Sequence, residues 1–321
     1  MAVSIVQVGF GNVGRTLARI LADDTKAYKV LAFCDSRGCA VKEGGFASNE
    51  IHSLLQVPRG GLSDTQYGYG GSVHRLLNTL NPDVVVDVRP SVYSDPDLEI
   101  YALQPRLEYH IVTANKAPLA VEPSLLTGNP YRERIHYRAT FMAGTPLFDL
   151  LTYGLAGRSV ASVRGVFNTT TTYMLTLASR GASYEEALGK AVEEGVAEPD
   201  PSIDVDCIDP AAKASIIAAT LGYEVPLHMV RRIGLREHWG TGGFARCVSR
   251  IERRDGPAYV SVGPEEIPEG DPLRLAVGKR NVAVVSVDDG NEIILSGSGG
   301  GPVQTAMTLF SDIVKASRGL W

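Results

Sequence analysis

The sequence predicts an α/β protein with two domains: a doubly wound, mostly parallel sheet followed by an α+β domain. Short apolar runs at 3–8, 29–34 and 83–88 alternate with segments of helical spacing, as in strand–helix–strand units. Strands of antiparallel type are expected only later, over 244–262 and 273–295. A chain of 321 residues is long enough to bury the cores of two domains.

Composition and charge exclude several classes of protein. The net charge of −5 argues against nucleic acid or an anionic membrane as the main partner. No apolar run approaches the roughly 18 residues of a membrane-spanning helix, and no secretory signal pattern opens the chain. The cysteines lack C-x-x-C spacing, so a reducing, cytoplasmic setting is expected, although Cys34 and Cys39 could pair if the fold brought them together.

A glycine motif follows the first strand directly. The run G-F-G-N-V-G at 9–14 lies between the strand at 3–8 and a helix expected over 15–22. In this context the glycines allow a tight turn, let backbone amides approach a pyrophosphate, and permit close packing of strand and helix. The motif therefore predicts a Rossmann-type dinucleotide-binding domain. The candidate cofactor-binding residues are Gly9, Phe10, Gly11, Asn12, Val13 and Gly14.

The end of the second strand bears on the choice between NAD and NADP. Asp35 lies 21 residues after Gly14, close to the usual spacing of an acid that binds the adenine ribose. Ser36 and Arg37 follow, and an arginine there can stack on adenine and bind a 2′-phosphate. Asp35 favours NAD and Arg37 favours NADP. We prefer NADP slightly and leave open both dual use and a plain strand end with solvated neighbours.

The rest of the first domain continues the alternation of helices and strands. A glycine-rich stretch at 44–72 is expected to form a long loop over the cofactor, with one helix near 47–56. The further elements expected are helices at 72–80 and 96–107 and strands at 83–88, 110–116 and 135–141.

Polar residues follow two of these strands. Arg89-Pro90-Ser91 comes after one, and Thr113-Ala114-Asn115-Lys116 ends the other. Ligands of open parallel sheets bind beyond the strand ends, so both segments are expected near the nicotinamide. Lys116 is then either a catalytic cation beside the transferred hydride, or a phosphate-binding or surface charge.

The second domain is expected to begin with a strand at 162–167 and a run of threonines. The run N-T-T-T-T at 168–172 precedes a helix expected at 173–179. Such a run offers hydroxyls and free amides to a carboxylate, or it is only an N-cap. Two further helices are expected, at 183–194 after a capping box and at 305–317.

An acidic stretch, E-P-D-P-S-I-D-V-D-C-I-D-P-A-A-K, runs from Glu198 to Lys213. Its prolines predict an extended loop for the first half. Asp209 and Pro210 are predicted to be the N-cap and first residue of a helix that ends at Gly222. Lys213 then lies on the same helix face as Asp209, where carboxylates would hold its ammonium for proton transfer or substrate anchoring. The alternative is a solvated acidic loop before an ordinary surface helix.

Together these segments resemble homoserine dehydrogenase along nearly the whole chain. Six blocks in the family's order are far more specific than any one of them. They are G-F-G-N-V-G at 9–14, T-A-N-K at 113–116, A-G-T-P at 143–146, G-V-F-N-T-T at 165–170, G-V-A-E-P-D-P at 195–201 with D-x-x-x-K at 209–213, and G-S-G-G-G-P-x-x-T-A at 297–306.

The resemblance implies reversible hydride transfer between NAD(P)H and L-aspartate 4-semialdehyde, giving L-homoserine on the way to threonine and methionine. It places Lys116 and Lys213, two of only eight lysines, at the reacting oxygen as catalytic residues. A lysine there stabilises the forming alkoxide and can donate its proton. The implied substrate-binding residues are Thr170, Glu198, Asp204 and Asp209, and further cofactor contacts are implied for Thr113, Ala114 and Gly300.

Four positions depart from the family pattern. Arg138 stands where many members have a glutamate beside a monovalent cation, so no metal is expected. Thr169 and Cys207 replace usual glycines, and Arg89 replaces a usual threonine. They motivate one alternative, a related NAD(P)-dependent dehydrogenase of another small amino or hydroxy acid. A second alternative is a dinucleotide-binding sensor without turnover.

The resemblance also implies domain roles and partners. Residues 1–137, completed by the C-terminal helix within 302–321, would bind the dinucleotide. Residues 138–301 would bind substrate and mediate dimerisation. We expect a cytoplasmic homodimer that acts on a small molecule, without nucleic acid or membrane partners and without ACT or aspartate kinase domains.

Overall fold

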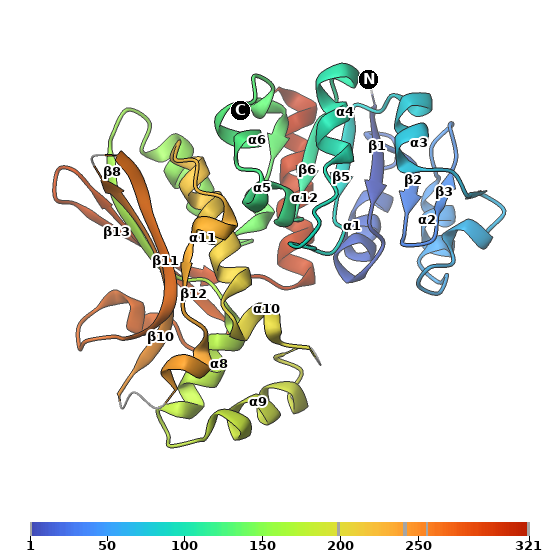
Figure 1. Cartoon of the computed structure of the whole chain (residues 1–321). Helices are drawn as coiled ribbons and strands as arrows, with labels where there is room; N and C mark the ends of the chain where they lie inside the picture. Colours follow the sequence, from blue (N-terminus) through green and yellow to red (C-terminus); the bar gives the residue numbers. More distant parts are fainter. Residues whose placement is uncertain (1, 198–199, 240–242, 255, 320–321) are drawn as a thin grey trace. The chain divides into compact units, whose positions relative to one another are not determined.

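The computed structural model describes residues 2–197, 200–239, 243–254 and 256–319 (Figure 1). The chain forms two compact units. The first contains Met1–Pro118, Gly128–Thr140 and Gly301–Trp321, and the second contains Leu119–Thr127 and Phe141–Gly300. Compared with the predicted boundaries, this division places Leu119–Thr127 in the second unit and residues 138–140 in the first.

A seven-stranded sheet in the order β4-β3-β2-β1-β5-β6-β7 forms the first unit. Its strands pair in parallel from β2 to β7, and β3 and β4 are antiparallel additions at one edge. The doubly wound, mostly parallel α/β fold is confirmed; β3 and β4, three and two residues long, were not predicted. The strands are β1 (Val3–Val8), β2 (Tyr28–Cys34), β3 (Cys39–Val41), β4 (Gly68–Tyr69), β5 (Val84–Asp87), β6 (His110–Thr113) and β7 (Ile135–His136).

Helices from both ends of the chain share one apolar core with this sheet. Leu17 and Leu21 of the first helix cluster with Leu309 and Ile313 of the last helix and with Ile5 of β1. The C-terminal helix therefore belongs to the first unit, as its apolar spacing allows. The helices of this unit are α1 (Asn12–Ala22), α2 (Ser48–Leu54), α3 (Val73–Leu80), α4 (Glu99–Leu107) and α12 (Pro302–Arg318), while α5 (Ala117–Val121) ends in the second unit.

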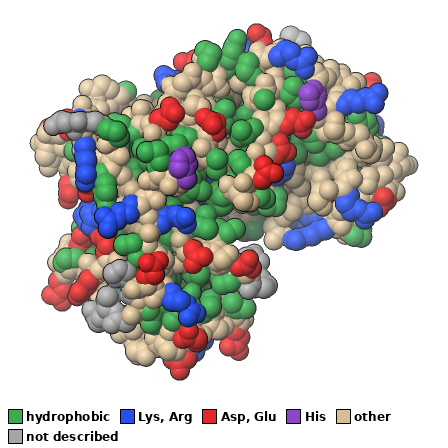
Figure 2. Space-filling view, in the orientation of Figure 1, with side chains coloured by type: hydrophobic (Ala, Val, Ile, Leu, Met, Phe, Trp, Pro, Cys, Tyr) green, Lys and Arg blue, Asp and Glu red, His purple; other side chains and the backbone are tan. Residues whose placement is uncertain are grey.

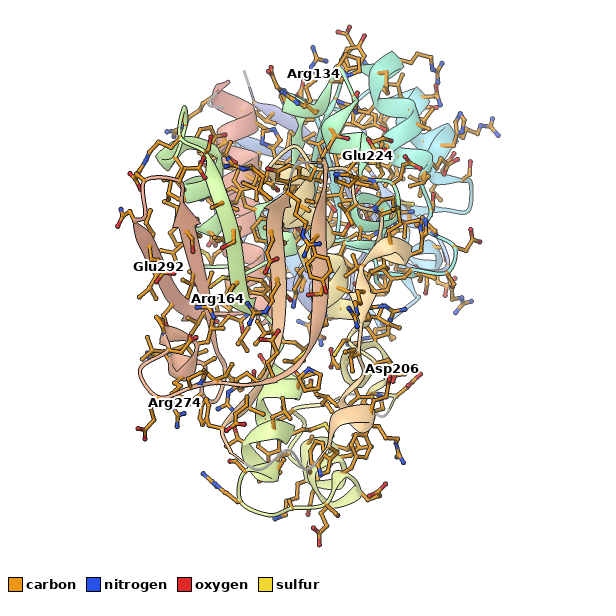
Figure 3. All side chains as sticks on the ribbon, turned by 60° about the vertical axis from the view of Figure 1, so that its left-hand side comes forward. Arg134, Arg164, Asp206, Glu224, Arg274 and Glu292 are labelled. Carbon is orange, nitrogen blue, oxygen red and sulfur yellow. A yellow bond between two sulfur atoms is a disulfide. The ribbon has the colours of Figure 1, made fainter. Side chains whose placement is uncertain are left out.

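A six-stranded sheet in the order β13-β12-β8-β10-β11-β9 forms the second unit. All its strand pairs are antiparallel except that of β9 with β11. The helices α8 and α11 pack on β10, and Figure 3 shows α11 behind the strands, with Arg164 on β8. The strands are β8 (Val160–Val166), β9 (Arg231–Arg232), β10 (Ala245–Arg254), β11 (Gly256–Glu266), β12 (Arg280–Val287) and β13 (Glu292–Ser298).

The second unit contains six α-helices and one π-helical turn among its described residues. An α+β second domain is thus confirmed. The helices are α6 (Ser124–Thr127), α7 (Leu147–Asp149), the π-helical turn Leu150–Gly154, α8 (Thr169–Ala178), α9 (Tyr184–Glu193), α10 (Ser202–Val205) and α11 (Ile208–Thr220).

The threonine run was predicted to precede a helix, and that prediction is wrong. Helix α8 begins at Thr169, with Asn168 as its N-cap. The hydroxyls of Thr171 and Thr172 donate to the carbonyl oxygen of Asn168, at 3.2 and 2.7 Å. These bonds satisfy the threonine side chains inside the first turn, which offsets their low intrinsic helix propensity.

The acidic stretch is less extended than predicted. Pro201 is the N-cap of α10, so Asp204 lies in a one-turn helix instead of a loop. Helix α11 begins at Ile208, and its N-cap is Cys207 with a φ of 57°, instead of Asp209. A proline restricts the residue before it, but it is tolerated at a helix start.

The last parallel strand is shorter than predicted. β7 ends at His136, and a 3-10 turn over Arg138–Thr140 follows it.

Within the described part of the chain, no helix is both long and apolar enough to cross a bilayer. Acidic and basic side chains are interspersed over the face shown in Figure 2.

Candidate active site

The turn between β1 and α1 has the backbone geometry that a dinucleotide site requires. Gly9 has a φ of 112°, and a Cβ on it would lie 2.5 Å from the carbonyl oxygen of Val88. A Cβ on Gly14 would lie 2.3 Å from the carbonyl oxygen of Gly9, whereas a Cβ on Gly11 would meet nothing within 4 Å. Packing thus requires two of the glycines, and the third leaves open space where a phosphate can approach the start of α1. The turn and the start of α1 contain the predicted residues Gly9, Phe10, Gly11, Asn12, Val13 and Gly14.

The buried side chain of Gln7, which was not predicted, fixes this turn. Its Nε2 donates to the carbonyl oxygens of Gly9 and Gly14, at 2.9 and 3.0 Å. Phe10 packs on Phe33 with ring centroids 5.2 Å apart, so only the main chain of Phe10 can meet a ligand. A polar residue in a buried strand directly before a glycine motif is the signal that would have identified Gln7.

Two arginines connect the turn to the loop after α2. Arg15 donates to the carbonyl oxygens of Leu55 and Val57, both at 2.7 Å. Arg59 donates to Oδ1 of Asn12 at 2.7 Å. Burial, and then the charge of Arg59, lower the pKa of Arg15. The glycine-rich loop therefore contacts the dinucleotide turn, and it contributes Arg59, a cation that its sequence did not single out.

Asp35 stabilises the turn that follows β2. Its Oδ1 accepts from the backbone amides of Arg37 and Gly38, at 2.9 and 3.2 Å. Its Oδ2 accepts from the backbone amide of Leu62 at 3.1 Å. Ser36 and Arg37 are exposed at the tip of the turn. Three structural bonds leave the Asp35 carboxylate with reduced capacity for a ligand.

A disulfide closes this turn. Cys34 and Cys39 are cross-strand partners of β2 and β3 and are joined by the disulfide. The backbone amide of Gly9 donates to the carbonyl oxygen of Cys34 at 2.9 Å. The turn with the predicted cofactor residues Asp35, Ser36 and Arg37 is therefore both covalently closed and tied to the glycine turn.

Asp87 organises the carboxyl ends of β5 and β6. It is fully buried and accepts from Nε of Arg89 at 2.9 Å and from Nδ2 of Asn115 at 3.2 Å. Burial opposes the charge of Arg89, but the carboxylates of Asp87 and Asp97 outweigh it and raise the pKa of Arg89. The guanidinium of Arg89 is thus held by the two acids Asp87 and Asp97.

Lys116 directly follows Asn115, which belongs to the hydrogen-bond network of Asp87. Its backbone amide donates to Oγ of Ser91 at 2.9 Å. The backbone amide of Ala114 donates to the carbonyl oxygen of Asp87 at 3.1 Å, and Oγ1 of Thr113 donates to the same oxygen at 3.1 Å. The predicted residues Thr113, Ala114 and Lys116 therefore come together at one edge of the sheet.

In the second unit, a single hydrogen-bonded cluster gathers most of the predicted substrate residues. Nδ2 of Asn168 donates to Oδ1 of Asp204 at 2.7 Å and to Oδ2 of Asp209 at 3.1 Å. Thr170 donates its hydroxyl to Oδ2 of Asp204 at 2.7 Å. Nζ of Lys213 donates to Oδ2 of Asp209 at 2.6 Å. Asn168 was predicted only as part of a possible N-cap, and its place between two acids had no sequence signal.

Two acceptors hold the side chain of Lys213 in place. Its Nζ also donates to the carbonyl oxygen of Phe167 at 2.6 Å. The Lys213 and Asp209 side chains are 11% and 13% exposed, so solvent screens their attraction less than at an open surface. Asp209 lies in the first turn of α11, where a negative charge complements the helix dipole. An ammonium held in this way can stabilise a forming oxyanion and donate a proton.

Two further predicted residues are Glu198 and Gly300. Glu198 lies outside the described residues. Gly300 follows β13, and Oγ of Ser298 donates to its carbonyl oxygen at 3.1 Å. The hydroxyl of Thr170 is engaged by Asp204, and the side chain is buried.

Arg138 forms an ion pair in the first unit. Its Nη1 lies 3.4 Å from Oδ1 of Asp312 and donates to Oγ of Ser311 at 3.0 Å. Burial raises the pKa of Asp312 to about 7, and the charge of Arg138 opposes that shift. No group of three or more His, Cys, Asp or Glu side chains is arranged to hold a metal in the part of the chain that the structure describes.

Comparisons with known proteins give a consistent result. A family model described as homoserine dehydrogenase matches residues 146–314. The homoserine dehydrogenase of Pyrococcus horikoshii is 32% identical over 99% of this chain and 98% of its own length. That of Methanocaldococcus jannaschii is 30% identical over 97% of each chain. A solved hyperthermophilic archaeal homoserine dehydrogenase in complex with NADPH is 31% identical, with a TM-score of 0.86 over 99% of this chain and 98% of that one.

Proposed function

We propose, from the premise that this chain belongs to the homoserine dehydrogenase family, that it prefers NADP(H) and interconverts L-homoserine and L-aspartate 4-semialdehyde. The chain is an oxidoreductase that acts on a CH–OH group. The observation that carries the proposal is the cluster of Asp204, Asp209 and Lys213, in which acids and an ammonium share one partly buried network.

The proposed chemistry requires positive charge and a proton at the substrate oxygen. A bound dinucleotide would supply or accept the hydride at C4 of its nicotinamide. During aldehyde reduction the oxygen becomes negative, and the Lys213 ammonium stabilises it and donates a proton from Nζ. In the reverse direction the neutral Lys213 amine that remains after this donation takes the hydroxyl proton back and becomes an ammonium again. Asp209 keeps Nζ oriented at 2.6 Å, and the family pattern assigns Lys116 a second cationic role at the oxygen.

The other end of the substrate is a zwitterion. We assign its ammonium to Asp204, Asp209 and Glu198, because an alkylammonium with three N–H groups is matched by several carboxylates. We assign its carboxylate to the start of α8 near Thr170, where a helix N-terminus favours negative charge. This charge pattern selects an amino acid over a simple hydroxy acid.

The preference for NADP(H) rests on the first unit. The carboxylate of Asp35 already accepts three backbone amides, which weakens the case for a ribose contact. Arg37 is exposed beside it, and Arg59 reaches Asn12 at the start of α1. Guanidinium groups bind phosphate well, and the similar solved enzyme is in complex with NADPH.

The proposal extends to setting and assembly. We propose a homodimer that works in threonine and methionine biosynthesis, with a small molecule as its only substrate class and no nucleic acid or membrane partner. A cytoplasmic location fits this role, because the cofactor and an amino-acid substrate are intracellular metabolites. Light scattering of the purified protein tests the dimer, and a single-chain mass would contradict it.

The experiment that tests the function is oxidation of L-homoserine at alkaline pH, followed at the nicotinamide absorbance with NADP and NAD in parallel. We expect turnover with homoserine and a higher kcat/KM with NADP. A matched substrate, 4-hydroxybutyrate, lacks only the ammonium and should be turned over poorly. Turnover of another amino or hydroxy acid in place of homoserine would favour a related dehydrogenase. Tight dinucleotide binding without any turnover would favour a sensor.

A further inference from the structure

We propose that Asn168 is a positioning residue whose side-chain amide bridges the carboxylates of Asp204 and Asp209 and holds them together. This role deepens the proposed function and rests on it, because the two acids are assigned to the substrate ammonium and to Lys213. Asn168 bonds both acids, so the proposed effect acts through them.

The orientation of the Asn168 amide follows from its bonds. Its Oδ1 accepts from the backbone amide of Thr171 at 2.9 Å, as the N-cap of α8. The opposite end of the amide is therefore Nδ2, which must face the acids. Nδ2 has two N–H groups, and it donates to Asp204 at 2.7 Å and to Asp209 at 3.1 Å. The side chain is 5% exposed, so water competes little for these bonds.

The two acids need such a donor. Carboxylates that accept from the same nitrogen are close neighbours, and like charges at short range in a partly buried site repel each other. One amide with two N–H groups lies between them and donates to both, which offsets this repulsion. Thr170 and Lys213 bond the remaining sides, so a continuous chain runs from Thr170 through Asp204, Asn168 and Asp209 to Lys213.

The backbone around Asn168 reinforces this arrangement. The carbonyl oxygen of Phe167, the preceding residue, accepts from Nζ of Lys213 at 2.6 Å. The carbonyl oxygen of Asn168 accepts from the hydroxyl of Thr172 at 2.7 Å. The junction between β8 and α8 thus positions both groups. The main chain of Phe167 holds the Lys213 ammonium, and the side chain of Asn168 holds Asp204 and Asp209.

The substitution Asn168→Asp separates this role from capping. Aspartate has the same shape and is an equally good N-cap, so Thr171 keeps its acceptor. The Nδ2 donor of Asn168, however, is replaced by a carboxylate oxygen, so a third carboxylate then faces Asp204 and Asp209. If Asn168 were only a cap, an ionised aspartate at this helix N-terminus would be neutral or stabilising. If it bridges the acids, the variant is destabilised wherever all three are ionised.

The decisive measurement is the thermal midpoint of wild type and Asn168→Asp between about pH 4 and about pH 8. Repulsion raises the pKa of the new carboxyl in the folded state, so the variant loses stability as pH rises. We expect a deficit that grows by on the order of 5 °C across this range. The control Ser72→Asp adds the same charge at the N-cap of α3, whose first turn has no acid, and should show no growing deficit. An Asn168→Asp curve that follows the control overturns the proposal.

Turnover provides the second readout. For homoserine oxidation, Asn168→Asp should lower kcat about a hundredfold, shift the acidic limb of the pH profile to higher pH and leave NADPH affinity unchanged. Asn168→Ser keeps a cap without the new charge, so it should lose turnover without the pH shift. Wild-type kcat in Asn168→Ser overturns the proposal. If wild type does not oxidise homoserine, the proposed function fails, while the stability comparison still decides the role of Asn168.

Discussion

The glycine turn of the first unit and the acidic cluster of the second unit achieve their geometry in opposite ways. The turn at 9–14 is built from consecutive residues. Its shape requires glycine at Gly9 and Gly14, because a Cβ at either position would overlap a backbone carbonyl. The cluster joins Asn168 to the segment with Asp204 and Lys213, which begins 36 residues further along the chain, and it depends on hydrogen bonds between polar side chains. Substitutions that add atoms should therefore disrupt the glycine turn, and substitutions that remove polar atoms should disrupt the acidic cluster.

The largest effect is expected from removing the ammonium of the cluster. Lys213→Ala should lower kcat for homoserine oxidation about a thousandfold, because the ammonium paired with Asp209 is removed and the oxyanion loses its stabilising charge. Lys190→Ala on α9 is the matched control and should retain normal turnover. Stopped-flow or steady-state kinetics and fluorescence titration of NADPH check both arms. Near-normal kcat in Lys213→Ala would remove this lysine from the mechanism.

Adding atoms to the glycine turn should separate stability from binding. Gly14→Ala places a Cβ 2.3 Å from a carbonyl oxygen and should lower the thermal midpoint strongly. Gly11→Ala meets nothing within 4 Å, so the fold should keep its stability while NADPH affinity falls at least tenfold, because the methyl group occupies space that the pyrophosphate needs. Calorimetry and NADPH titration of both variants test this. Unchanged affinity in Gly11→Ala would place the phosphates elsewhere.

A smaller effect is expected at the edge of the cofactor site. Arg37→Ala should weaken NADPH binding about tenfold and leave NADH binding nearly unchanged, because only NADPH carries the 2′-phosphate. Arg19→Ala, an exposed arginine of α1, is the control for a general loss of positive charge. Titrations with both dinucleotides give the ratio of affinities. Equal losses for NADPH and NADH would assign Arg37 to the adenine or the backbone of the cofactor.

The smallest effect on stability is expected at Asp312, a buried acid outside the cluster of Asp204 and Asp209. Among the described residues, Oδ2 of Asp312 has no hydrogen-bond partner, and burial raises the pKa of Asp312 to about 7. Because this folded value exceeds the unfolded one of about 3.9, the stability it contributes is present at acidic pH and is lost as pH rises through about 7. The thermal midpoint of wild type should therefore fall by a few degrees more than that of Asp312→Asn between about pH 5 and about pH 8. Parallel curves would contradict this reasoning.

The contrast between the two regions also explains what could be predicted from sequence. The dinucleotide turn and the helices and parallel strands around it follow from local patterns, such as G-x-G-x-x-G after an apolar strand. The residues that tie this turn in place, Gln7 and Arg59, were not predicted. Gln7 sits inside an apolar run, and the contact of Arg59 with Asn12 joins residues 47 positions apart.

The acidic cluster was predicted in its residue types but not in its arrangement. Prolines suggested a loop for Asp204, yet Pro201 is placed where a helix tolerates it, at the N-cap of α10. The threonine run was predicted to precede a helix and to offer its hydroxyls to a carboxylate, but it lies inside α8, and Thr170 donates its hydroxyl to Asp204. Such pairings depend on how β8, α8 and α11 pack, and no local pattern encodes that packing.

The disulfide between Cys34 and Cys39 has a consequence for limited proteolysis. The exposed Arg37 lies between the two cysteines, at the tip of a turn where a protease specific for arginine can reach the main chain. A cut after Arg37 leaves the two fragments joined through the sulfur atoms, so a non-reducing gel shows one band and a reducing gel shows two. Nicked molecules would thus keep their two fragments covalently joined even after denaturation, and a reductant would then separate them.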